Sequence, residues 1–355
     1  MWLNLLLVFV PVAFVLEYAG VGGTWVFLVS ALAILPLAGL MGRATEELAA
    51  RTGTAVGGLL NATFGNATEL IIAFFALQAG RIDVVKASIV GSILGNLLLV
   101  LGLSVLLGGL RFHVQIFNRR SAGNVASLLT ISVLALLIPT IFDVVSRRTE
   151  TNAEVTRLDV SLSDATAVVL ILLYVANIVF SLVTHRDLIS TSDESNEEQH
   201  ATWSPARATF VLLGATVLVG FMSEFLVGSL EAATATLGLS ELFVGLVLIP
   251  IIGNAAEHTA AVTFALKNRM ELAVTIAFGS TVQVALLVAP VLVLLGLVVG
   301  QPMNLVVSQL ELVAVAAAVV IANSVSRDGE TNWLEGVMLL GVYAILAFAV
   351  YYLPA

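Results

Sequence analysis

The sequence predicts an all-α integral membrane protein with about eleven transmembrane helices, in which two inverted five-helix repeats follow one leading helix. Of its 355 residues, 59% are hydrophobic and only 11% are charged. A soluble domain carries about 25% charged residues, so this chain must be solvated by lipid. Apolar stretches long enough to cross a ~30 Å hydrocarbon core recur along the whole chain. The two most polar of these stretches match each other without a gap when Gly65 is aligned with Gly253.

The composition and the absence of familiar motifs exclude several classes of protein. The chain contains no cysteine, which excludes disulfides, thiolate metal sites and cysteine nucleophiles. The net charge of −9 argues against nucleic acid as a partner, because that task needs a basic surface. HExxH, GxSxG, P-loop and glycine-rich dinucleotide patterns are all missing. We therefore expect no enzyme, no cofactor and no ATP-driven pump, unless a partner supplies the ATPase.

The apolar stretches define the expected helices and domains. They cover residues 2–18, 23–41, 55–79, 84–110, 124–145, 162–184, 206–229, 241–266, 271–299, 304–323 and 331–353, with the longest loops at 42–54, 111–123, 146–161 and 185–205. The first stretch is interpreted as a helix rather than a signal peptide, because it lacks a basic start and a small-residue cleavage site. The expected domains are a leading helix in 1–22, a first repeat in 23–184, an acidic cytoplasmic linker in 185–205 and a second repeat in 206–355.

Lysine and arginine in the loops predict the orientation. With the N-terminus in the cytoplasm, cytoplasmic loops carry ten of these residues and external loops carry five. The excess follows the positive-inside rule and places the C-terminus outside. Within the linker, residues 187–200 carry five carboxylates. This segment is either a solvated connection, which we favour, or a regulatory or ion-attracting element.

The internal match indicates an inverted repeat. Gly65, Asn66, Ala67 and Glu69 fall on Gly253, Asn254, Ala255 and Glu257, and Arg81, Asp83, Gly91 and Ser92 fall on Arg269, Glu271, Gly279 and Ser280. Five helices separate the equivalent segments, and an odd number makes them cross the membrane in opposite directions. In transporters of this kind the substrate site lies near the midplane, on helices broken by glycine or proline. Gly65 lies in one motif, and Pro250 and Gly253 lie in the other.

Glu69 and Glu257 are the main candidate ligands. A carboxylate buried in hydrocarbon costs several kcal/mol, so an intramembrane acid indicates a function, although a hydrogen-bonded glutamate between helices is the structural alternative. Asn66 and Asn254 lie three residues earlier, on the same helical face. Carboxylate and amide oxygens are suited to Ca²⁺, which takes 6–8 oxygen ligands, and two carboxylates neutralise its charge.

The following helices supply a second layer of polar groups. Ser92 and Asn96 lie in GSILGN, and Ser280 and Gln283 lie in GSTVQ. Each could bind the cation, orient a glutamate or simply join two helices by a hydrogen bond. Asn96 and Gln283 are one position out of register, which suggests unequal roles.

Other acids and one histidine are candidates for carrying protons. His258 follows Glu257 directly and therefore points elsewhere on a helix. It is either a proton relay or, as we favour, a satisfied polar residue. Glu46 and Glu224 also fit ordinary solvated acids at helix ends.

These motifs resemble the cation/proton exchanger family of the calcium/cation antiporter superfamily. The matching stretches are GGLLNATFGNATELI at 57–71, GSILGNLLLVLG at 91–102, FVGLVLIPIIGNAAEH at 243–258, ALKN and the downstream GSTVQ. Sodium/calcium exchangers typically have a Thr-Ser-Pro-Glu type motif where this sequence has Asn-Ala-Thr-Glu and Asn-Ala-Ala-Glu, so the proton-coupled branch fits better. The resemblance implies that Glu69 and Glu257 bind Ca²⁺ with help from the amides and hydroxyls named above. It also implies, from weaker matches, that Glu46 and Glu224 help to carry protons.

The expected function is Ca²⁺/H⁺ antiport by alternating access. Ca²⁺ needs both glutamates ionised, whereas burial favours their protonated forms once the ion has left. An empty site with two charges is too costly to cross the bilayer, so exchange is obligatory. Na⁺-coupled exchange is the main alternative, and a cation channel or an intramembrane enzyme is weaker. The expected partners are Ca²⁺, H⁺ and the lipid bilayer. Homo-oligomeric assembly is left open, and we expect the protein in the cell membrane of a prokaryote.

Overall fold

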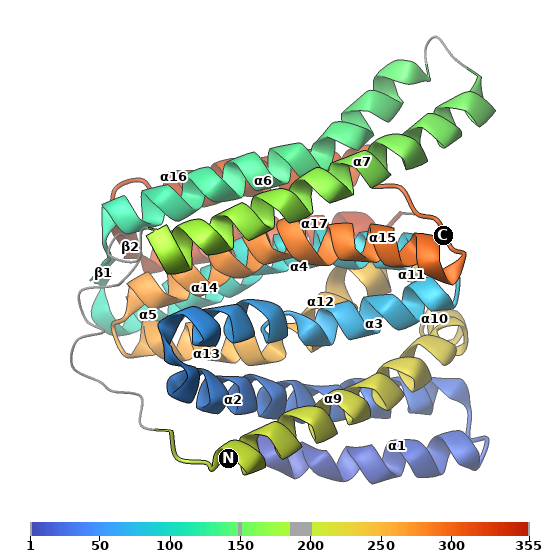
Figure 1. The fold of residues 1–355 in the computed structure, drawn as a ribbon, viewed down its shortest axis with the longest axis horizontal. Coiled ribbons are helices and arrows are strands. Elements are labelled where there is room, and N and C mark those ends of the chain that lie inside the picture. The colour runs from blue at the N-terminus through green and yellow to red at the C-terminus, as the bar shows by residue number, and fades with distance from the viewer. Residues whose placement is uncertain (1, 148–150, 185–200, 354–355) are drawn as a thin grey trace. The chain divides into compact units, whose positions relative to one another are not determined.

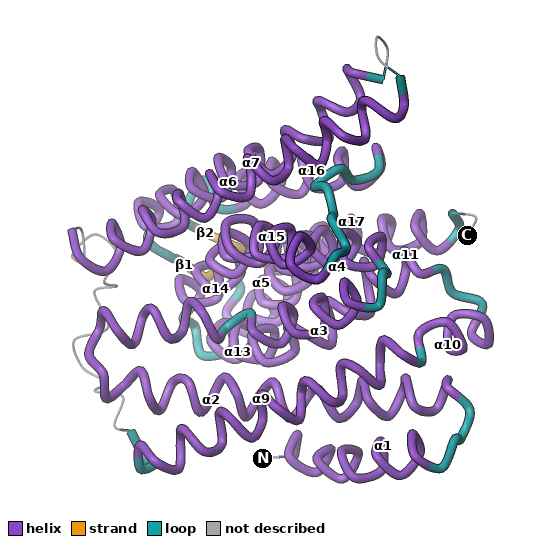
Figure 2. Tube along the Cα trace, turned by 45° about the vertical axis from the view of Figure 1, so that its right-hand side comes forward, coloured by secondary structure: helices purple, strands orange, loops and turns teal. Residues whose placement is uncertain are grey.

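The protein is almost entirely helical (Figures 1 and 2). The computed structural model describes residues 2–147, 151–184 and 201–353. They form two compact units. Unit 1 contains Met1–Phe75, Leu173–Leu239 and Ile252–Ala256, and unit 2 contains Ala76–Leu172, Ser240–Ile251 and Glu257–Ala355. The acidic segment 187–200 of the predicted linker lies outside the described residues.

Seven helical segments among the described residues are long and apolar enough to cross a membrane. They are Gly23–Thr52, Ile82–Phe112, Ala122–Ser146, Asn152–Val179, Pro205–Gly228, Met270–Val299 and Trp333–Tyr351. An eighth apolar segment consists of Leu230–Leu237 and Glu241–Gly253, which are bent by 111° at the break between them. The predicted helical class is therefore confirmed, and the described residues contain fewer uninterrupted apolar helices than the sequence pattern predicts.

Unit 1 is built around a long helix, α2, with α9 beside it. Its elements are the 3₁₀ helix η1 (Trp2–Val8), α1 (Phe9–Tyr18), α2 (Gly23–Phe64), the π-helix η3 (Phe180–Thr184), α9 (Pro205–Gly228) and α10 (Leu230–Leu237), together with the first part of α3 (Ala67–Gln78) and the last residues of α7. Helices α1 and α9 pack along α2, as both views of the chain show (Figures 1 and 2). Phe14 of α1 packs edge-on against Phe225 of α9, with ring centroids 5.2 Å apart.

The predicted loop at 42–54 is wrong, because α2 continues through it to Phe64. This segment is rich in alanine, glutamate and arginine, which favour a helix even where the hydrophobic pattern ends. The helix bends sharply in its second half. A Cβ on Gly57 would lie 2.7 Å from the carbonyl oxygen of Ala49. Positions eight residues apart are about 12 Å apart in a straight helix, so the chain turns back on itself at this point.

Unit 2 surrounds a continuous central span made of α4, η2 and α5. Its elements are α4 (Ile82–Leu94), the π-helix η2 (Gly95–Val100), α5 (Leu101–Phe112), β1 (Val114–Ile116), α6 (Arg119–Ser146), most of α7 (Asn152–Val179), α11 (Glu241–Phe243), the π-helix η4 (Val244–Leu248), the first part of α12 (Ile249–Gly253), most of α13 (Ala255–Leu266), α14 (Met270–Gln283), the π-helix η5 (Val284–Val288), α15 (Ala289–Val299), α16 (Gln309–Val325), β2 (Glu330–Asn332) and α17 (Trp333–Tyr351). The end of α12 and the start of α13 belong to unit 1. The central span is the most buried of the unit. Helix α17 packs on α5, and α6 packs on both α14 and α16.

The loops of unit 2 are shorter than predicted. Helix α7 begins at Asn152, so the second half of the predicted loop 146–161 is helical. The predicted loop 111–123 contains β1 and the start of α6. Strand β1 pairs with β2 in an antiparallel register, with Gln115 opposite Thr331. The Gln115 amide donates to the carbonyl oxygen of Ala265 at 2.8 Å, which attaches this small sheet to the end of α13.

Candidate cation site

Both glutamate motifs lie where a helix is interrupted. Helix α2 ends at Phe64 and α3 begins at Ala67, so Gly65 and Asn66 lie between them. Helix α12 ends at Gly253 and α13 begins at Ala255, so Asn254 lies between those two helices. The predicted helices 55–79 and 241–266 are therefore broken, as expected for a substrate site on discontinuous helices. Each break leaves the end carbonyls of one helix and the first N–H groups of the next without α-helical partners.

The position of each glutamate relative to its break has an electrostatic consequence. Glu69 lies in the first turn of α3, and Glu257 lies in the first turn of α13. The positive end of a helix dipole stabilises an ionised carboxylate. The last carbonyls of the preceding helix supply oxygen atoms that suit a cation. An asparagine followed three residues later by a glutamate is also the pattern of a capping box, so helix capping explains part of the same arrangement.

In unit 1 the two motifs meet at Glu69 and Gly253. Asn66, Glu69 and Asn254 are buried, with exposed fractions of 1%, 5% and 2%. A Cβ on Gly253 would lie 2.8 Å from Cγ of Glu69, which is closer than real atoms approach. Glycine at this position therefore makes room for the Glu69 side chain. The sequence predicts Gly253 only as a helix breaker, and this contact with Glu69 adds a second role.

In unit 2 a chain of hydrogen bonds leads to Glu257. The Asn96 amide donates to the Ser280 hydroxyl at 3.0 Å. The Ser280 side chain is in turn hydrogen-bonded to the Glu257 carboxyl group. The second oxygen, Oε2 of Glu257, is buried and has no hydrogen bond within the described residues. The structure thus joins three of the predicted site residues from α4–η2, α13 and α14.

Ser92 and Gln283 lie on α4 and α14, the helices that also carry the region of Asn96 and Ser280. Ser92 is buried on α4, one turn before Asn96, and Gln283 is half-buried at the end of α14. Asn96 lies inside the π-helix η2, whereas Gln283 directly precedes the π-helix η5. π-Helical turns are rare and are frequent at functional sites.

Glycine allows α4 to approach a neighbouring helix closely. A Cβ on Gly91 would overlap the carbonyl oxygen of Leu246 and would lie 2.6 Å from Cγ of Pro250. A Cβ on Gly245 would lie 2.7 Å from Cβ of Ala87. The backbones of α4 and η4 therefore pack directly on each other, as small residues permit in membrane helices.

The candidate proton carriers lie apart from these contacts. Glu46 and Glu224 are exposed. His258 is half-buried, and its Nε2 atom has no hydrogen-bond partner in the described part of the chain. The roles of these three residues remain predictions.

Glu47, which the sequence analysis does not single out as a site residue, is a structural acid of unit 1. It is 9% exposed and accepts hydrogen bonds from the backbone N–H groups of Thr202 at 2.7 Å and Trp203 at 2.9 Å. The Trp203 ring also contacts the guanidinium groups of Arg43 and Arg207, at 4.9 and 4.6 Å from its centroid. These contacts attach the residues before α9 to α2.

The sequence and the fold have counterparts among known proteins. The family model described as sodium/calcium exchanger protein matches residues 22–183 and 207–352. The chain belongs to the sodium/calcium exchanger family. It is therefore an integral membrane protein, and the resemblance deduced from its motifs is confirmed.

Individual members of the family match nearly the whole chain. A protein named Ca²⁺/H⁺ antiporter from Synechocystis sp. is 48% identical over 367 residues, covering 98% of this chain and 96% of that protein. The Ca²⁺/H⁺ antiporter ChaA of Bacillus subtilis is 44% identical, with 92% of each chain covered.

Solved structures of exchangers share the fold. The structure of native YfkE has a TM-score of 0.85 at 40% identity, covering 99% of this chain and all of that one. The H⁺/Ca²⁺ exchanger CAX has a TM-score of 0.73 at 15% identity and covers 99% of this chain and 92% of its own. The second likeness shows a common fold only.

Proposed function

We propose that this protein exchanges Ca²⁺ for H⁺ across a membrane by alternating access, with Glu69 and Glu257 binding the two ions in turn. The observation that carries this function is the near full-length identity to proteins named Ca²⁺/H⁺ antiporter. The position of both glutamates at helix breaks, with Glu69 buried and Oε2 of Glu257 buried, supports the assignment of the site. The protein acts as a transporter rather than an enzyme, and Ca²⁺ is its cargo rather than a cofactor.

The two glutamates make the exchange obligatory in this proposal. Their ionised carboxylates neutralise Ca²⁺, and Asn66, Asn254 and main-chain carbonyls at the breaks supply further oxygen ligands. When Ca²⁺ leaves, two buried negative charges cannot cross hydrocarbon without protons. The loaded and the protonated sites are both close to neutral and can change the side to which they open. Asn96 and Ser280 then position the Glu257 carboxyl group for either ion.

The proposal includes eleven helices and two inverted repeats, and the local structure supports the repeat. In the alignment that places Gly65 on Gly253, helices α3 and α13 begin and end at equivalent positions, and α4 and α14 begin at equivalent positions. Gly80 and Asn268, which are equivalent in the same alignment, both have positive φ angles, of 74° and 59°. Such conformations are uncommon outside glycine, so their recurrence at equivalent positions favours a true repeat.

We also propose that the N-terminus is cytoplasmic and the C-terminus external, in the cell membrane of a prokaryote. The chain has no cysteine, so single cysteines can report the side of the membrane. Glu154 and Glu330 are exposed and lie in loops that are predicted to be external and cytoplasmic, respectively. An impermeant maleimide added to intact cells should label Glu154→Cys and not Glu330→Cys. The reverse pattern would contradict the orientation. In a separate experiment, mass photometry of the purified protein would measure whether it is a homo-oligomer.

Flux measurements in liposomes test the site. Wild-type protein should take up radioactive Ca²⁺ when a pH gradient is imposed, and Glu69→Gln and Glu257→Gln should each abolish this uptake. Glu330→Gln is the matched control, because it removes an exposed carboxylate and should leave uptake unchanged. Full uptake by either site variant would remove that glutamate from the proposal while leaving the antiport function intact.

Na⁺-coupled exchange is the second candidate, because the matching family model is described as sodium/calcium exchanger protein. It predicts Ca²⁺ flux that follows a Na⁺ gradient and ignores a pH gradient. The same liposomes loaded with Na⁺ at equal pH on both sides distinguish the two functions.

A further inference from the structure

A group of basic side chains lies in unit 1, outside the proposed exchange site. Arg43 and Arg51 lie on α2, Arg207 lies in the first turn of α9, and all three are exposed. The guanidinium groups of Arg43 and Arg207 contact the buried ring of Trp203, at 4.9 and 4.6 Å from its centroid. Arg51 donates hydrogen bonds to the carbonyl oxygens of Trp203 and, at 3.2 Å, of Ala201. We call the three arginines and Trp203 the arginine cluster.

The residues around the arginine cluster hold it in place without neutralising it. Glu47, one turn after Arg43, accepts hydrogen bonds from the backbone N–H groups of Thr202 at 2.7 Å and Trp203 at 2.9 Å, and from the Thr202 hydroxyl. Glu46 is exposed beside it. Within the part of the chain that the structure describes, neither glutamate forms an ion pair with an arginine of the cluster. A guanidinium group that lies on an aromatic ring keeps the N–H donors at its edge available for a ligand.

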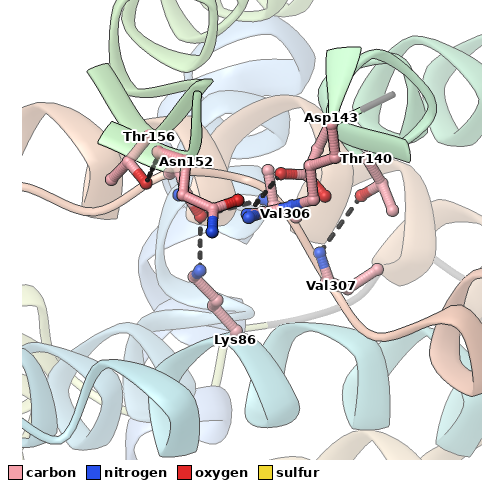
Figure 3. Close-up of polar contacts among 9 residues, drawn as sticks. Lys86, Thr140, Asp143, Asn152, Thr156, Val306 and Val307 are labelled. Atoms are coloured by element: carbon pink, nitrogen blue, oxygen red, sulfur yellow. Dashed lines mark hydrogen bonds and ion pairs between the residues drawn. The ribbon is translucent and has the colours of Figure 1, made fainter. Parts of the chain in front are cut away.

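Three other basic side chains are already paired within the protein. Lys86 of α4 donates a hydrogen bond to a side-chain oxygen of the segment between α15 and α16 (Figure 3). Arg81 pairs with Glu241 at 2.8 Å, and Arg147 pairs with Asp143 at 2.6 Å. The arginine cluster differs from these pairs, because it brings three cations together around one ring with no acid in ion-pair contact among the described residues.

The arginine cluster lies at the polar ends of two apolar stretches, 23–41 of α2 and 206–229 of α9. Both views show α2 and α9 side by side (Figures 1 and 2). From the cluster onward, α9 exposes Phe210, Leu213 and Val217, with exposed fractions of 80%, 61% and 59%. Their spacing of three and four residues places them on one face of the helix. In an integral membrane protein such a face contacts acyl chains, and tryptophan and arginine at its end mark the level of the lipid headgroups.

We propose that the arginine cluster binds the phosphate group of an anionic phospholipid, whose acyl chains lie along the exposed apolar face of α9. Arginine binds phosphate oxygens through two N–H groups at once, and the contacts with Trp203 arrange two of the guanidinium groups in advance. The three guanidinium groups outnumber the carboxylates of Glu46 and Glu47, and the N-terminus of α9 adds positive partial charge. The bound lipid connects α2 to the start of α9. This site is independent of the proposed exchange of Ca²⁺ for H⁺.

Native mass spectrometry of the purified full-length protein tests this site without any transport. The protein is mixed with phosphatidylglycerol or with phosphatidylcholine of the same acyl chains. Wild-type protein should retain phosphatidylglycerol in preference, and the double variant Arg43→Gln, Arg207→Gln should bind it roughly tenfold more weakly. Arg111→Gln is the matched control, because Arg111 is also exposed and lies over an aromatic ring, 5.4 Å from the centroid of Phe112. This control should bind phosphatidylglycerol as wild-type protein does.

Two further measurements keep the outcome clear. The Tm of each variant in detergent without lipid shows whether it folds. If the double glutamine variant does not fold, Arg43→Lys with Arg207→Lys keeps both charges but loses the paired donors, and this variant should also bind phosphatidylglycerol more weakly than wild-type protein. Glycerol phosphate at the concentration of the lipid should not displace phosphatidylglycerol, because it lacks the acyl chains that contact α9.

Three results would overturn the proposal. The first is equal retention of the two lipids by wild-type protein, or equal retention of phosphatidylglycerol by wild-type protein and the cluster variants. The second is full displacement by glycerol phosphate, which would assign the cluster to a soluble phosphate. The third is retention of phosphatidylglycerol only after the five carboxylates of residues 187–200 are replaced by amides, which would make that acidic segment the occupant.

Discussion

Asn96 donates a 3.0 Å hydrogen bond to Ser280, whose side chain is hydrogen-bonded to Glu257. Because the Ser280 oxygen accepts from Asn96, its own hydrogen is free to point toward the glutamate. One residue from each of two helices therefore acts on the Glu257 carboxyl group. This relationship at Glu257 can be tested directly.

The Asn96→Ala substitution removes the bond that orients Ser280. A hydrogen bond contributes about 0.5–1.5 kcal/mol, so we expect the KM for Ca²⁺ to rise roughly 2- to 12-fold. Ser88→Ala is the control, because Ser88 is buried on the same helix and donates to the carbonyl oxygen of Val85. The double variant with Ser280→Ala should add little to the loss from Ser280→Ala alone. Fully additive losses would show that the two side chains act independently.

The Gly253→Ala substitution should impair transport by moving Glu69. Its methyl group would lie 2.8 Å from Cγ of Glu69, so the side chain or the helix break must shift. We expect at least a tenfold fall in Ca²⁺ uptake with little change in Tm. Gly279→Ala is the matched control, because nothing lies within 4 Å of its added methyl group. It should keep transport and raise helix stability slightly. Normal uptake by Gly253→Ala would mean that Glu69 has room to move without loss of function.

The Glu47→Gln substitution should lower stability rather than transport. Oε2 of Glu47 accepts from the backbone N–H groups of Thr202 and Trp203 and Oε1 accepts from the Thr202 hydroxyl, whereas glutamine has one acceptor oxygen and cannot accept all three bonds. We expect Tm to fall by roughly 3–5 °C in detergent. Glu46→Gln, next to it and exposed, should leave Tm unchanged. A fall in uptake for Glu46→Gln at constant Tm would support its predicted part in carrying protons, whereas an unchanged rate would count against it.

Replacing Gly80 with asparagine should leave the stability of the protein unchanged, whereas replacing it with valine should lower that stability. Its φ angle is 74°, and Asn268 holds the equivalent position in the second motif region at 59°. Asparagine visits this conformation at low cost, whereas a left-handed conformation costs an ordinary residue about 1–2 kcal/mol and more for a β-branched one. Gly80→Asn should keep the wild-type Tm, and Gly80→Val should lower it by roughly 2–6 °C. Equal Tm values for the two variants would contradict this interpretation.

Local features of the sequence predict a large part of the fold. The helix breaks at Gly65–Asn66 and at Asn254 follow from polar, glycine-containing motifs inside apolar stretches. The prediction of a loop at 42–54 is wrong because the charged residues there end the hydrophobic pattern but not the helix. Whether the helix continues depends on the helix propensity of the residues. The hydropathy pattern predicts which segments can contact lipid, but it predicts the residues at which helices end less accurately.

Contacts between distant segments could not be predicted. Asp159 falls in a predicted loop, where an acid would be solvated, although it is fully buried on α7. Nothing in the local pattern of residues 146–161 shows this burial. The contact of Gly253 with Glu69 could not be predicted for the same reason, because it joins segments that lie in opposite halves of the chain.

The π-helices η2 and η5 have a consequence for how the two halves are aligned. A π turn closes its hydrogen bond one residue later than an α turn, so in an alignment it behaves as an insertion of one residue. Such an insertion rotates the helix before it by about 100° relative to the helix after it. Asn96 lies inside the insertion of the first half, whereas Gln283 lies just before that of the second half. The two π-helices end at equivalent positions, Val100 and Val288, so both halves carry the insertion, and a relative with one residue fewer at either place should have a straight α-helix there.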